Sequence, residues 1–137
     1  MSYRIRYYGI SHIGRCRKVN QDNLICEKTI LPCRNKGTGE MLTGIASPGR
    51  ETVFGVFDGM GGEEQGEVAA YIAAEHMRTF SRWAKDGSDL TDFCREANGA
   101  ICKYTKDHGL TSMGTTAVLL KFDTRGIWLC NIGDSKA

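Results

Sequence analysis

The chain is organised around a short apolar run that ends in a carboxylate. Residues 53–57 (Val-Phe-Gly-Val-Phe) are followed by Asp58 and then by glycines at positions 59, 61 and 62. A continuous apolar run bounded by glycine predicts a buried strand, so Asp58 is the first polar side chain at its exposed end. The glycines allow positive φ and close backbone approach, which lets the chain turn tightly around an ion or an anion. The alternative interpretation is a plain strand-to-helix turn that Asp58 caps.

Two other strand ends repeat this arrangement. Asp22 precedes the apolar residues 24–26, and Asp134 follows the apolar run 128–132 after Gly133. Carboxylate, carbonyl and water oxygens are the ligands that Mg2+ and Mn2+ prefer in proteins. Three aspartates at strand ends, each beside glycine or asparagine, therefore indicate a metal site for a hard divalent cation.

Four motifs follow one another in a fixed order along nearly the whole chain. They are Arg17-x-x-Asn20-Gln21-Asp22, Phe57-Asp58-Gly59-Met60-Gly61-Gly62 with Gly66-Glu67, Gly114-Thr115-Thr116-Ala117-Val118 and Asn131-Ile132-Gly133-Asp134-Ser135. In this order they resemble the N-terminal half of a metal-dependent protein phosphatase of the PPM (type 2C) family. The resemblance implies an α+β fold, a four-layer α-β-β-α sandwich of two antiparallel sheets flanked by helix pairs. Residues 1–137 would supply about half of it, as the N-terminal part of a single domain.

The resemblance implies a protein serine/threonine phosphatase, which hydrolyses phosphoserine and phosphothreonine with metal-activated water. Two Mn2+ or Mg2+ ions lower the pKa of a bridging water and clamp the phosphate in such chemistry. By resemblance, Asp58 bridges the two ions, the Gly59 carbonyl adds an oxygen ligand, and Asp22 holds metal-bound water. Arg17 binds the substrate phosphate, which suits a guanidinium fork. Asp134 helps to hold a third ion, as in bacterial-type members.

The implied partners are phosphorylated proteins, with a cognate serine/threonine kinase acting in opposition. Thr115 and Thr116 are expected to pack or hydrogen-bond beside the site. Two positions depart from the family pattern. Gln21 stands where many relatives have glutamate, and Met60 stands where animal and plant members have histidine, so a histidine general acid at that position is excluded. Both departures favour a bacterial-type enzyme.

The family's remaining aspartate ligands lie in its C-terminal half and have no counterpart among these residues. Five other aspartates are interpreted as helix-end or turn residues: Asp86, Asp89, Asp92, Asp107 and Asp123. We therefore expect the full-length parent to be the enzyme, and this chain alone to bind metal weakly and to have little or no activity. The competing hypothesis is a non-catalytic phosphoprotein-binding or regulatory module on the same scaffold. A third is an unrelated Mg2+-binding hydrolase that shares only the Asp58 turn.

The composition excludes several other classes of protein. With 18 basic and 16 acidic residues, the formal charge of +2 gives no field that favours nucleic acid or an anionic membrane. There is no apolar run of about 18 residues and no signal segment, so we expect a soluble cytoplasmic protein. The six cysteines lack zinc spacing and are predicted to be free and mostly buried, with Cys16 and Cys33 the more exposed.

The remaining pattern predicts the secondary structure. Strands are expected at residues 3–10, 24–30, 53–57, 116–122 and 127–132, and residues 32–50 as a mobile loop with a short hairpin around 41–46. Apolar residues at helical spacing predict one helix over about 64–84 and a second from an N-cap at Ser88-Asp89 to Gly109. Both helices should face the core, and His12, His76, Met77, Trp83 and His108 are not expected to bind a cofactor.

Overall fold

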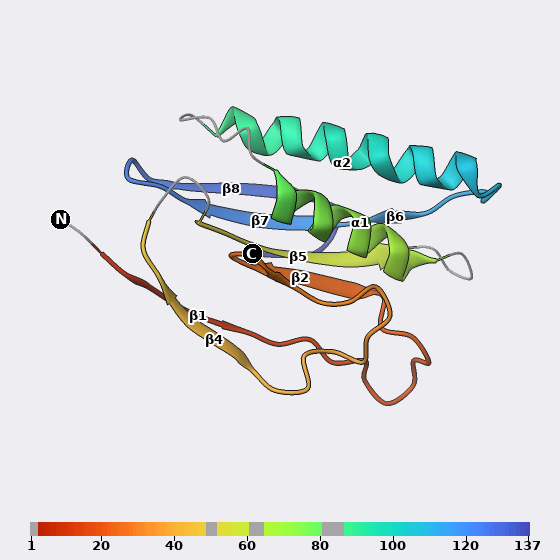
Figure 1. Cartoon of the computed structure of the whole chain (residues 1–137), viewed down its shortest axis with the longest axis horizontal. Helices are drawn as coiled ribbons and strands as arrows, with labels where there is room; N and C mark the ends of the chain where they lie inside the picture. Colours follow the sequence, from red (N-terminus) through yellow and green to blue (C-terminus); the bar gives the residue numbers. More distant parts are fainter. Residues whose placement is uncertain (1–2, 49–51, 61–64, 81–86) are drawn as a thin grey trace.

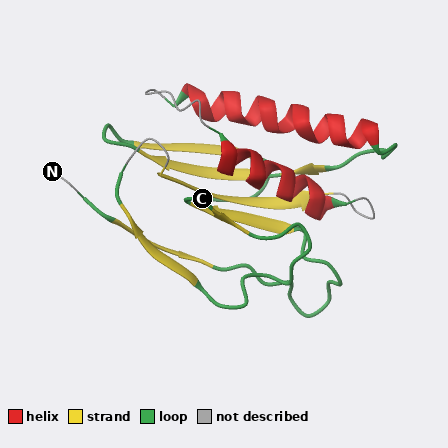
Figure 2. Cartoon of the chain, in the orientation of Figure 1, coloured by secondary structure: helices red, strands yellow, loops and turns green. Residues whose placement is uncertain are grey.

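The computed structural model describes residues 3–48, 52–60, 65–80 and 87–137. These residues form two antiparallel sheets and two helices (Figures 1 and 2). The larger sheet has the strand order β3-β2-β5-β7-β8, and β6 pairs with the end of β5. Its strands are β2 (Asp22–Cys26), β3 (Thr29–Ile30), β5 (Thr52–Met60), β6 (Gly114–Thr115), β7 (Ala117–Phe122) and β8 (Ile127–Ile132). The smaller sheet pairs β1 (Ile5–Gly9) with β4 (Leu42–Ala46).

The elements are arranged in layers. The helices α1 (Gly66–Thr79) and α2 (Ser88–Asp107) cover one face of the large sheet, and the β1–β4 ribbon lies toward its other face (Figure 1). This confirms the expected α+β fold with two antiparallel sheets. As expected, the chain supplies one helix pair and strands of both sheets.

The central strand β5 shows how the sequence pattern sets the two faces of the large sheet. Val53 and Phe57 are buried in the core under the helices, whereas Val56 and Asp58 are exposed on the alternate face. Side chains alternate between faces along a strand, so Asp58 must point away from the helices. The predicted strand over 53–57 is therefore confirmed, but β5 is longer because its last two residues pair with β6.

The main hydrophobic core lies between the helices and the large sheet. Its buried members include Ala69, Ala70, Ala73, Ala74 and Met77 of α1, Leu90, Phe93, Ala97 and Ile101 of α2, and Ile25, Val53, Phe57 and Leu119 of the sheet. The four alanines allow α1 to approach the strands closely, while the larger residues of α2 fill the space beside it. The prediction that both helices face the core is confirmed.

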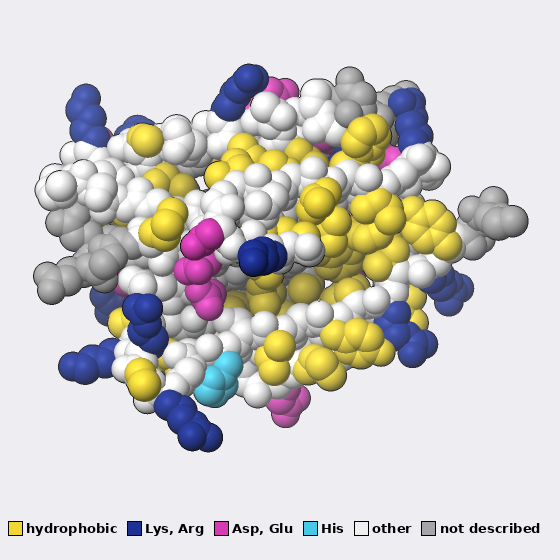
Figure 3. All heavy atoms as spheres, turned by 180° about the vertical axis from the view of Figure 1, so that it is seen from behind, with side chains coloured by type: hydrophobic (Ala, Val, Ile, Leu, Met, Phe, Trp, Pro, Cys, Tyr) yellow, Lys and Arg dark blue, Asp and Glu magenta, His cyan; other side chains and the backbone are white. Residues whose placement is uncertain are grey.

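A second cluster lies between the two sheets. Leu24, Cys26 and Leu31 are buried there, and Tyr7, Leu42 and Phe54 pack against them. Beyond this cluster, Val56, Ile127 and Leu129 remain exposed. The view from behind shows hydrophobic side chains spread over this region, with acidic side chains beside them (Figure 3).

Two of the strand predictions are wrong in detail. The single strand expected over 24–30 is a hairpin, because Glu27 adopts a left-handed backbone (φ 57°) and Cys26 pairs with Thr29. The hairpin expected around 41–46 is instead one strand, β4, which pairs with β1. Gly44 allows this pairing, since a Cβ there would lie 2.3 Å from the Tyr7 hydroxyl oxygen. Part of the segment 32–50, which was expected to be a mobile loop, is thus paired with β1, a strand far away in the sequence.

The helix predictions differ from the structure mainly at one end. α1 ends at Thr79, not near residue 84, because Phe80 has an extended backbone and its ring is buried against Phe93. Residues 81–86, which include Trp83 and Asp86, and residue 64 lie outside the described residues. The N-cap of α2 was expected at Ser88-Asp89, but the helix already begins at Ser88, and Gly87 occupies the N-cap position with φ 78°.

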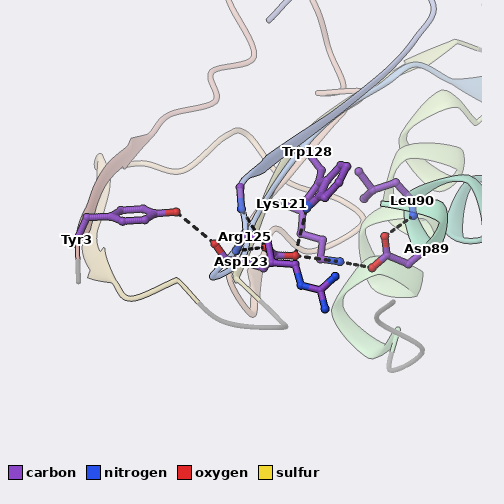
Figure 4. A network of polar contacts seen from close by, with 8 residues as sticks. Tyr3, Asp89, Leu90, Lys121, Asp123, Arg125 and Trp128 are labelled. Carbon is purple, nitrogen blue, oxygen red and sulfur yellow. Dashed lines mark hydrogen bonds and ion pairs between the residues drawn. The ribbon is translucent and has the colours of Figure 1, made fainter. Parts of the chain in front are cut away.

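A buried ion pair ties α2 to β7. Asp89 was predicted to be a helix-end residue, and it does lie in the first turn of α2, but its side chain is fully buried and binds Lys121 (Figure 4). Lys121 points from β7 toward the helices and is also fully buried. Asp123, whose carboxylate lies 4.0 Å from the Lys121 Nζ, completes the group.

Asp123 also organises the turn between β7 and β8. Its Oδ1 accepts hydrogen bonds from the backbone N–H groups of Arg125 (2.7 Å) and Gly126 (3.1 Å), and its Oδ2 accepts one from the Trp128 Nε1 (3.1 Å). Burial alone would raise the pKa of Asp123, but these hydrogen bonds and the charge of Lys121 lower it. This turn was predicted correctly, whereas its link to α2 was not.

All six cysteines are free, as predicted. They are less buried than expected: Cys26 is buried, Cys33, Cys94 and Cys130 are partly buried, and Cys16 and Cys102 are exposed. Among the residues that the structure describes, no helix combines the length and apolar character needed to cross a membrane.

Candidate functional site

The register of β2 on β5 places two of the predicted aspartates opposite one another. Asp22 pairs with Asp58 in this antiparallel ladder, and both side chains are exposed on the face away from the helices. Directly opposed residues in antiparallel strands have Cβ atoms about 5 Å apart, so two like charges there repel each other. Partial burial, the negative charge of Asp58 and a hydrogen bond with that carboxyl group raise the pKa of Asp22.

The two carboxylates line a pocket of about 320 Å3. Its walls come from the loop after β1, from β2 and β5, and from the segment after β8, including Ser11, His12, Asn23 and Ser135. Segments that are far apart in the sequence therefore meet at the aspartate pair. A concave site with a few converging polar groups is the usual form of a binding site for a small ligand.

The Gly114-Thr115-Thr116 turn fixes the backbone of Asp58. The Thr116 N–H donates to the Asp58 carbonyl oxygen (2.9 Å), and the Asp58 N–H donates to the Thr116 hydroxyl oxygen (3.1 Å). The Thr115 hydroxyl donates to the same carbonyl at 3.0 Å. The prediction that these threonines hydrogen-bond beside the site is confirmed, and their contacts are to the backbone of Asp58.

The segment after β8 reaches the site through Ser135. Its hydroxyl lies 2.7 Å from the Thr116 hydroxyl, so one of the two donates to the other. Gly133 makes this approach possible, because it adopts φ 95° and a Cβ there would lie 2.7 Å from the Thr116 Cγ2. Asp134 stands between these two residues and is exposed. The structure thus brings the chain at Asp134 to the pocket, but it gives Asp134 no contact with Asp58 or Asp22.

Position 59 requires glycine because the chain there packs closely against the start of α1. A Cβ on Gly59 would lie 2.1 Å from the Gly66 carbonyl oxygen, and a Cβ on Gly66 would lie 2.8 Å from the Gly59 carbonyl oxygen. The Gly59 N–H donates to the Gln21 carbonyl at 3.1 Å. Positive φ, which was expected through the glycine turn, does not occur at Gly59. The glycines at 61 and 62 lie outside the described residues.

Arg17 lies on the exposed loop that leads into β2. Its positive charge lowers the pKa of Asp22, in opposition to the larger effects of burial and of Asp58. His12 is exposed, as expected, and its Nδ1 accepts a hydrogen bond from the Gly14 N–H at 2.9 Å.

Asn20 is a positioning residue that the predictions did not single out. It is 3% exposed, and its amide nitrogen donates to the Ser11 hydroxyl (3.0 Å) and to the Asn35 side-chain oxygen (2.8 Å). Its own side-chain oxygen accepts from the Asp22 N–H (3.3 Å). Asn20 therefore joins two loops immediately before Asp22. The available signal was its place in the Arg17-x-x-Asn20-Gln21-Asp22 motif.

The residues present fit part of a metal site. Two opposed carboxylates, one with a raised pKa, are a favourable place for a hard cation, because the cation relieves the repulsion between them. However, within the described part of the chain no three His, Cys, Asp or Glu side chains are grouped closely enough to bind a metal. The donor set is therefore suited to a divalent cation but incomplete.

No family model and no curated protein sequence matches the chain. Its fold is similar to a crystal structure of the serine/threonine phosphatase PstP/Ppp of Mycobacterium tuberculosis, with a TM-score of 0.69 and 21% identity over 98% of this chain and 48% of that one. A structure of the PstP catalytic domain in complex with two manganese ions is similar at TM-score 0.69 and 22% identity, over 97% of this chain and 50% of that one. The chain thus spans about half the length of these structures, and the likeness establishes the fold.

Proposed function

We propose that this chain is the N-terminal half of a bacterial-type PPM (type 2C) protein phosphatase domain, which removes phosphate from serine and threonine residues of proteins. The observation that carries the proposal is the opposition of Asp22 and Asp58 at the mouth of a pocket, in a fold shared with PstP. The four ordered sequence motifs support it, because each of them contributes residues to this pocket or to the bonds that hold it.

The proposed metal is Mn2+ or Mg2+, with two ions in the core site and a third near Asp134. The PstP structure with two manganese ions supports Mn2+. Asp58 and the Gly59 carbonyl would provide direct oxygen ligands, and Asp22 would hold metal-bound water. When bound, such ions supply an activated water and neutralise charge on the phosphoryl group.

The chain's own residues would prepare the site for this chemistry. The hydrogen bonds from Thr115 and Thr116 hold the backbone of Asp58, so the ion does not have to order this part of the main chain. Asn20 does the same for the backbone of Asp22. Arg17 would bind two phosphate oxygens of the substrate, since its positive charge already acts on the pocket.

The substrates in this proposal are phosphorylated proteins in the cytoplasm, and a serine/threonine kinase would oppose the enzyme. The complete site needs further aspartates, which the family carries in its C-terminal half. With two carboxylates in place, the 137-residue chain alone would bind Mn2+ weakly and turn over little substrate.

The alternative is a non-catalytic module that binds phosphoproteins or regulates a partner. The observation in its favour is that the described residues group no three metal-binding side chains. The two proposals differ in one respect that can be measured: only the enzyme needs a divalent ion to turn over substrate.

The test is hydrolysis of p-nitrophenyl phosphate and of a phosphothreonine peptide by the gene-length protein, with Mn2+ and with EDTA. The enzyme proposal predicts Mn2+-dependent turnover that falls at least about 100-fold in Asp58→Asn, because the ion then loses its central carboxylate. Asp92→Asn, an exposed change on α2, is the matched control and should retain full activity. Folded protein without turnover would overturn the enzyme proposal and favour the module.

A further inference from the structure

Two cysteines from different elements lie side by side where α2 packs on β8. Cys94 on α2 and Cys130 on β8 place their sulfur atoms 3.7 Å apart, although 36 residues separate them in the sequence. Both pack against the main core cluster. A disulfide needs a sulfur separation of about 2.05 Å, so bond formation requires the two atoms to approach by less than the width of one atom.

Cys94 can be approached from solvent through a pocket. Cys94 lines a pocket of about 270 Å3 between α2 and the large sheet. The same pocket is lined by Met60 and Ile132, which are 53% and 46% exposed. Cys94 and Cys130 are themselves partly buried and not sealed in the core. A small oxidant such as hydrogen peroxide can therefore approach the pair from the side of Cys94 without unfolding of the domain.

We propose that Cys94 and Cys130 form a redox modification site, in which a peroxide-class oxidant joins them in a reversible disulfide that links α2 to β8. The inference goes beyond the proposed function and does not depend on it. Two S–H bonds and the O–O bond of the peroxide break, and one S–S bond and two water molecules form. Two electrons pass from the thiols to the peroxide, and a dithiol reductant returns the pair to its reduced state.

The environment of the pair makes the reaction slow. Burial, followed by the charge of Cys130 and a hydrogen bond with its sulfur, raises the pKa of Cys94 to about 12. The thiolate is the reactive form, so the thiol of Cys94 reacts little at neutral pH until its partner has been oxidised. Formation of the disulfide is therefore expected to be slow at neutral pH.

The position of the disulfide would connect the helix layer to the candidate site. After Cys130, β8 ends at Ile132 and the chain continues through Gly133 to Ser135, which contacts Thr116. In its first turn, α2 is already held to the sheet by Asp89 and Lys121. Oxidation adds a covalent attachment five residues further along the helix and reduces the freedom of the strand that leads to the pocket.

The experiment exposes the 137-residue protein to hydrogen peroxide, blocks the remaining thiols with N-ethylmaleimide and identifies peptides by mass spectrometry. The expected product is a linked pair of peptides that contain Cys94 and Cys130, with a mass loss of about 2 Da that dithiothreitol reverses. A variant in which the exposed cysteines are replaced, Cys16→Ser/Cys102→Ser, should give the same product. Cys94→Ser and Cys130→Ser should each abolish it.

A second readout covers the case in which the single variants fail to fold. The oxidised Cys16→Ser/Cys102→Ser protein should unfold roughly 5–10 °C above its reduced form, because the cross-link restricts the unfolded chain. The proposal is overturned if Cys94 and Cys130 are each recovered unlinked, whether alkylated or over-oxidised. It is also overturned if the disulfide joins either of them to another cysteine, or if the linked protein melts no higher than the reduced protein.

Discussion

Asp22 and Asp58 occupy opposing positions on β2 and β5, and the negative charge of Asp58 raises the pKa of Asp22. Neither sequence motif shows this pairing by itself, because 36 residues separate the two aspartates, which meet only through strand register. The exposed face of the large sheet thus carries a repulsion that a bound cation would remove. This relationship leads to the first two predictions.

Replacing Asp58 with asparagine should lower the pKa of Asp22. The substitution removes the charge, but it leaves the partial burial of Asp22, which is the larger cause, so the pKa should fall only part of the way to its ordinary value. Side-chain 13C NMR of Asp22 during a pH titration without divalent ions measures the change. Asp134→Asn is the control and should leave the titration unaltered. An unchanged pKa in Asp58→Asn would contradict the proposed coupling.

The raised pKa also predicts how stability depends on pH. The folded state holds the Asp22 proton more tightly than the unfolded chain does, so stability falls as pH rises from the ordinary aspartate pKa through the raised one. Asp22→Asn removes this loss, and we expect the metal-free variant to melt above the wild type at pH 7 and not at pH 3. Thermal unfolding at both pH values tests this. A variant that melts lower at pH 7 would show that Asp22 stabilises the metal-free fold.

Gly59 and Gly66 should tolerate no side chain. A Cβ on Gly59 would meet a backbone oxygen at 2.1 Å, and backbone atoms cannot move aside without shifting the end of β5 or the start of α1. We expect Gly59→Ala to cost about 3 kcal/mol of unfolding free energy or more. Gly99→Ala is the matched control: nothing lies within 4 Å of its added Cβ, and alanine in a helix should stabilise by about 0.5–1 kcal/mol. Urea unfolding measures both. Equal changes in unfolding free energy for Gly59→Ala and Gly99→Ala would contradict the packing explanation.

Much of the fold was predictable because its signals are local. The apolar run before Asp58, the two amphipathic helices and the hairpin turn at Asp123 each depend on residues that are close in sequence. β4 was missed because its short stretch of apolar and small residues reads as loop, and only its pairing with β1 makes it a strand. The end of α1 was misplaced because Phe80 continues the apolar spacing, although tertiary packing draws its ring into the core.

The residues of the candidate site were named from the aspartates at strand ends and from the motifs. They named Asp22, Asp58 and the threonines at 115 and 116, and the structure brings all four together. Asn20 was passed over because an asparagine beside a turn usually serves only the local backbone. The partnership of Asp89 with Lys121 was missed because a charged residue in a strand is usually exposed, and nothing local in the sequence indicates a buried partner.

The Asp89 and Lys121 pair should show strong, unequal and non-additive mutational effects. Lys121→Met removes the cation that the described part of the chain places against the buried Asp89, so we expect a loss of about 3–5 kcal/mol. Asp89→Asn should cost less, since Lys121 keeps Asp123 at 4.0 Å. The double variant Asp89→Leu/Lys121→Met should recover most of the loss, because it removes both charges of the pair, while Asp123 keeps its hydrogen bonds from the Arg125, Gly126 and Trp128 N–H groups. Urea unfolding at constant m-value provides the free energies. Additive losses would contradict a coupled pair.

The hydroxyl of Thr116 should matter more than its methyl group. Thr116→Val keeps the shape but removes the acceptor for the Asp58 N–H and the contact with Ser135, so we expect a loss of about 1–3 kcal/mol. Thr116→Ser retains the hydroxyl and should be the milder change. Unfolding free energies, together with the NMR shift of the Asp58 amide, distinguish the two. A serine variant as unstable as the valine variant would show that the methyl group dominates.

The most direct measurement of the central claim is a titration of the 137-residue protein with Mn2+, followed by 1H–15N NMR. Paramagnetic Mn2+ broadens nearby amide signals even when it binds weakly, so an incomplete site can still be located. The account predicts selective broadening at Asp22, Asp58 and Thr115, none at Gly99 on the outer helix, and loss of the effect in Asp58→Asn. Uniform broadening, or broadening that persists unchanged in Asp58→Asn, would contradict a metal site at this pair of aspartates.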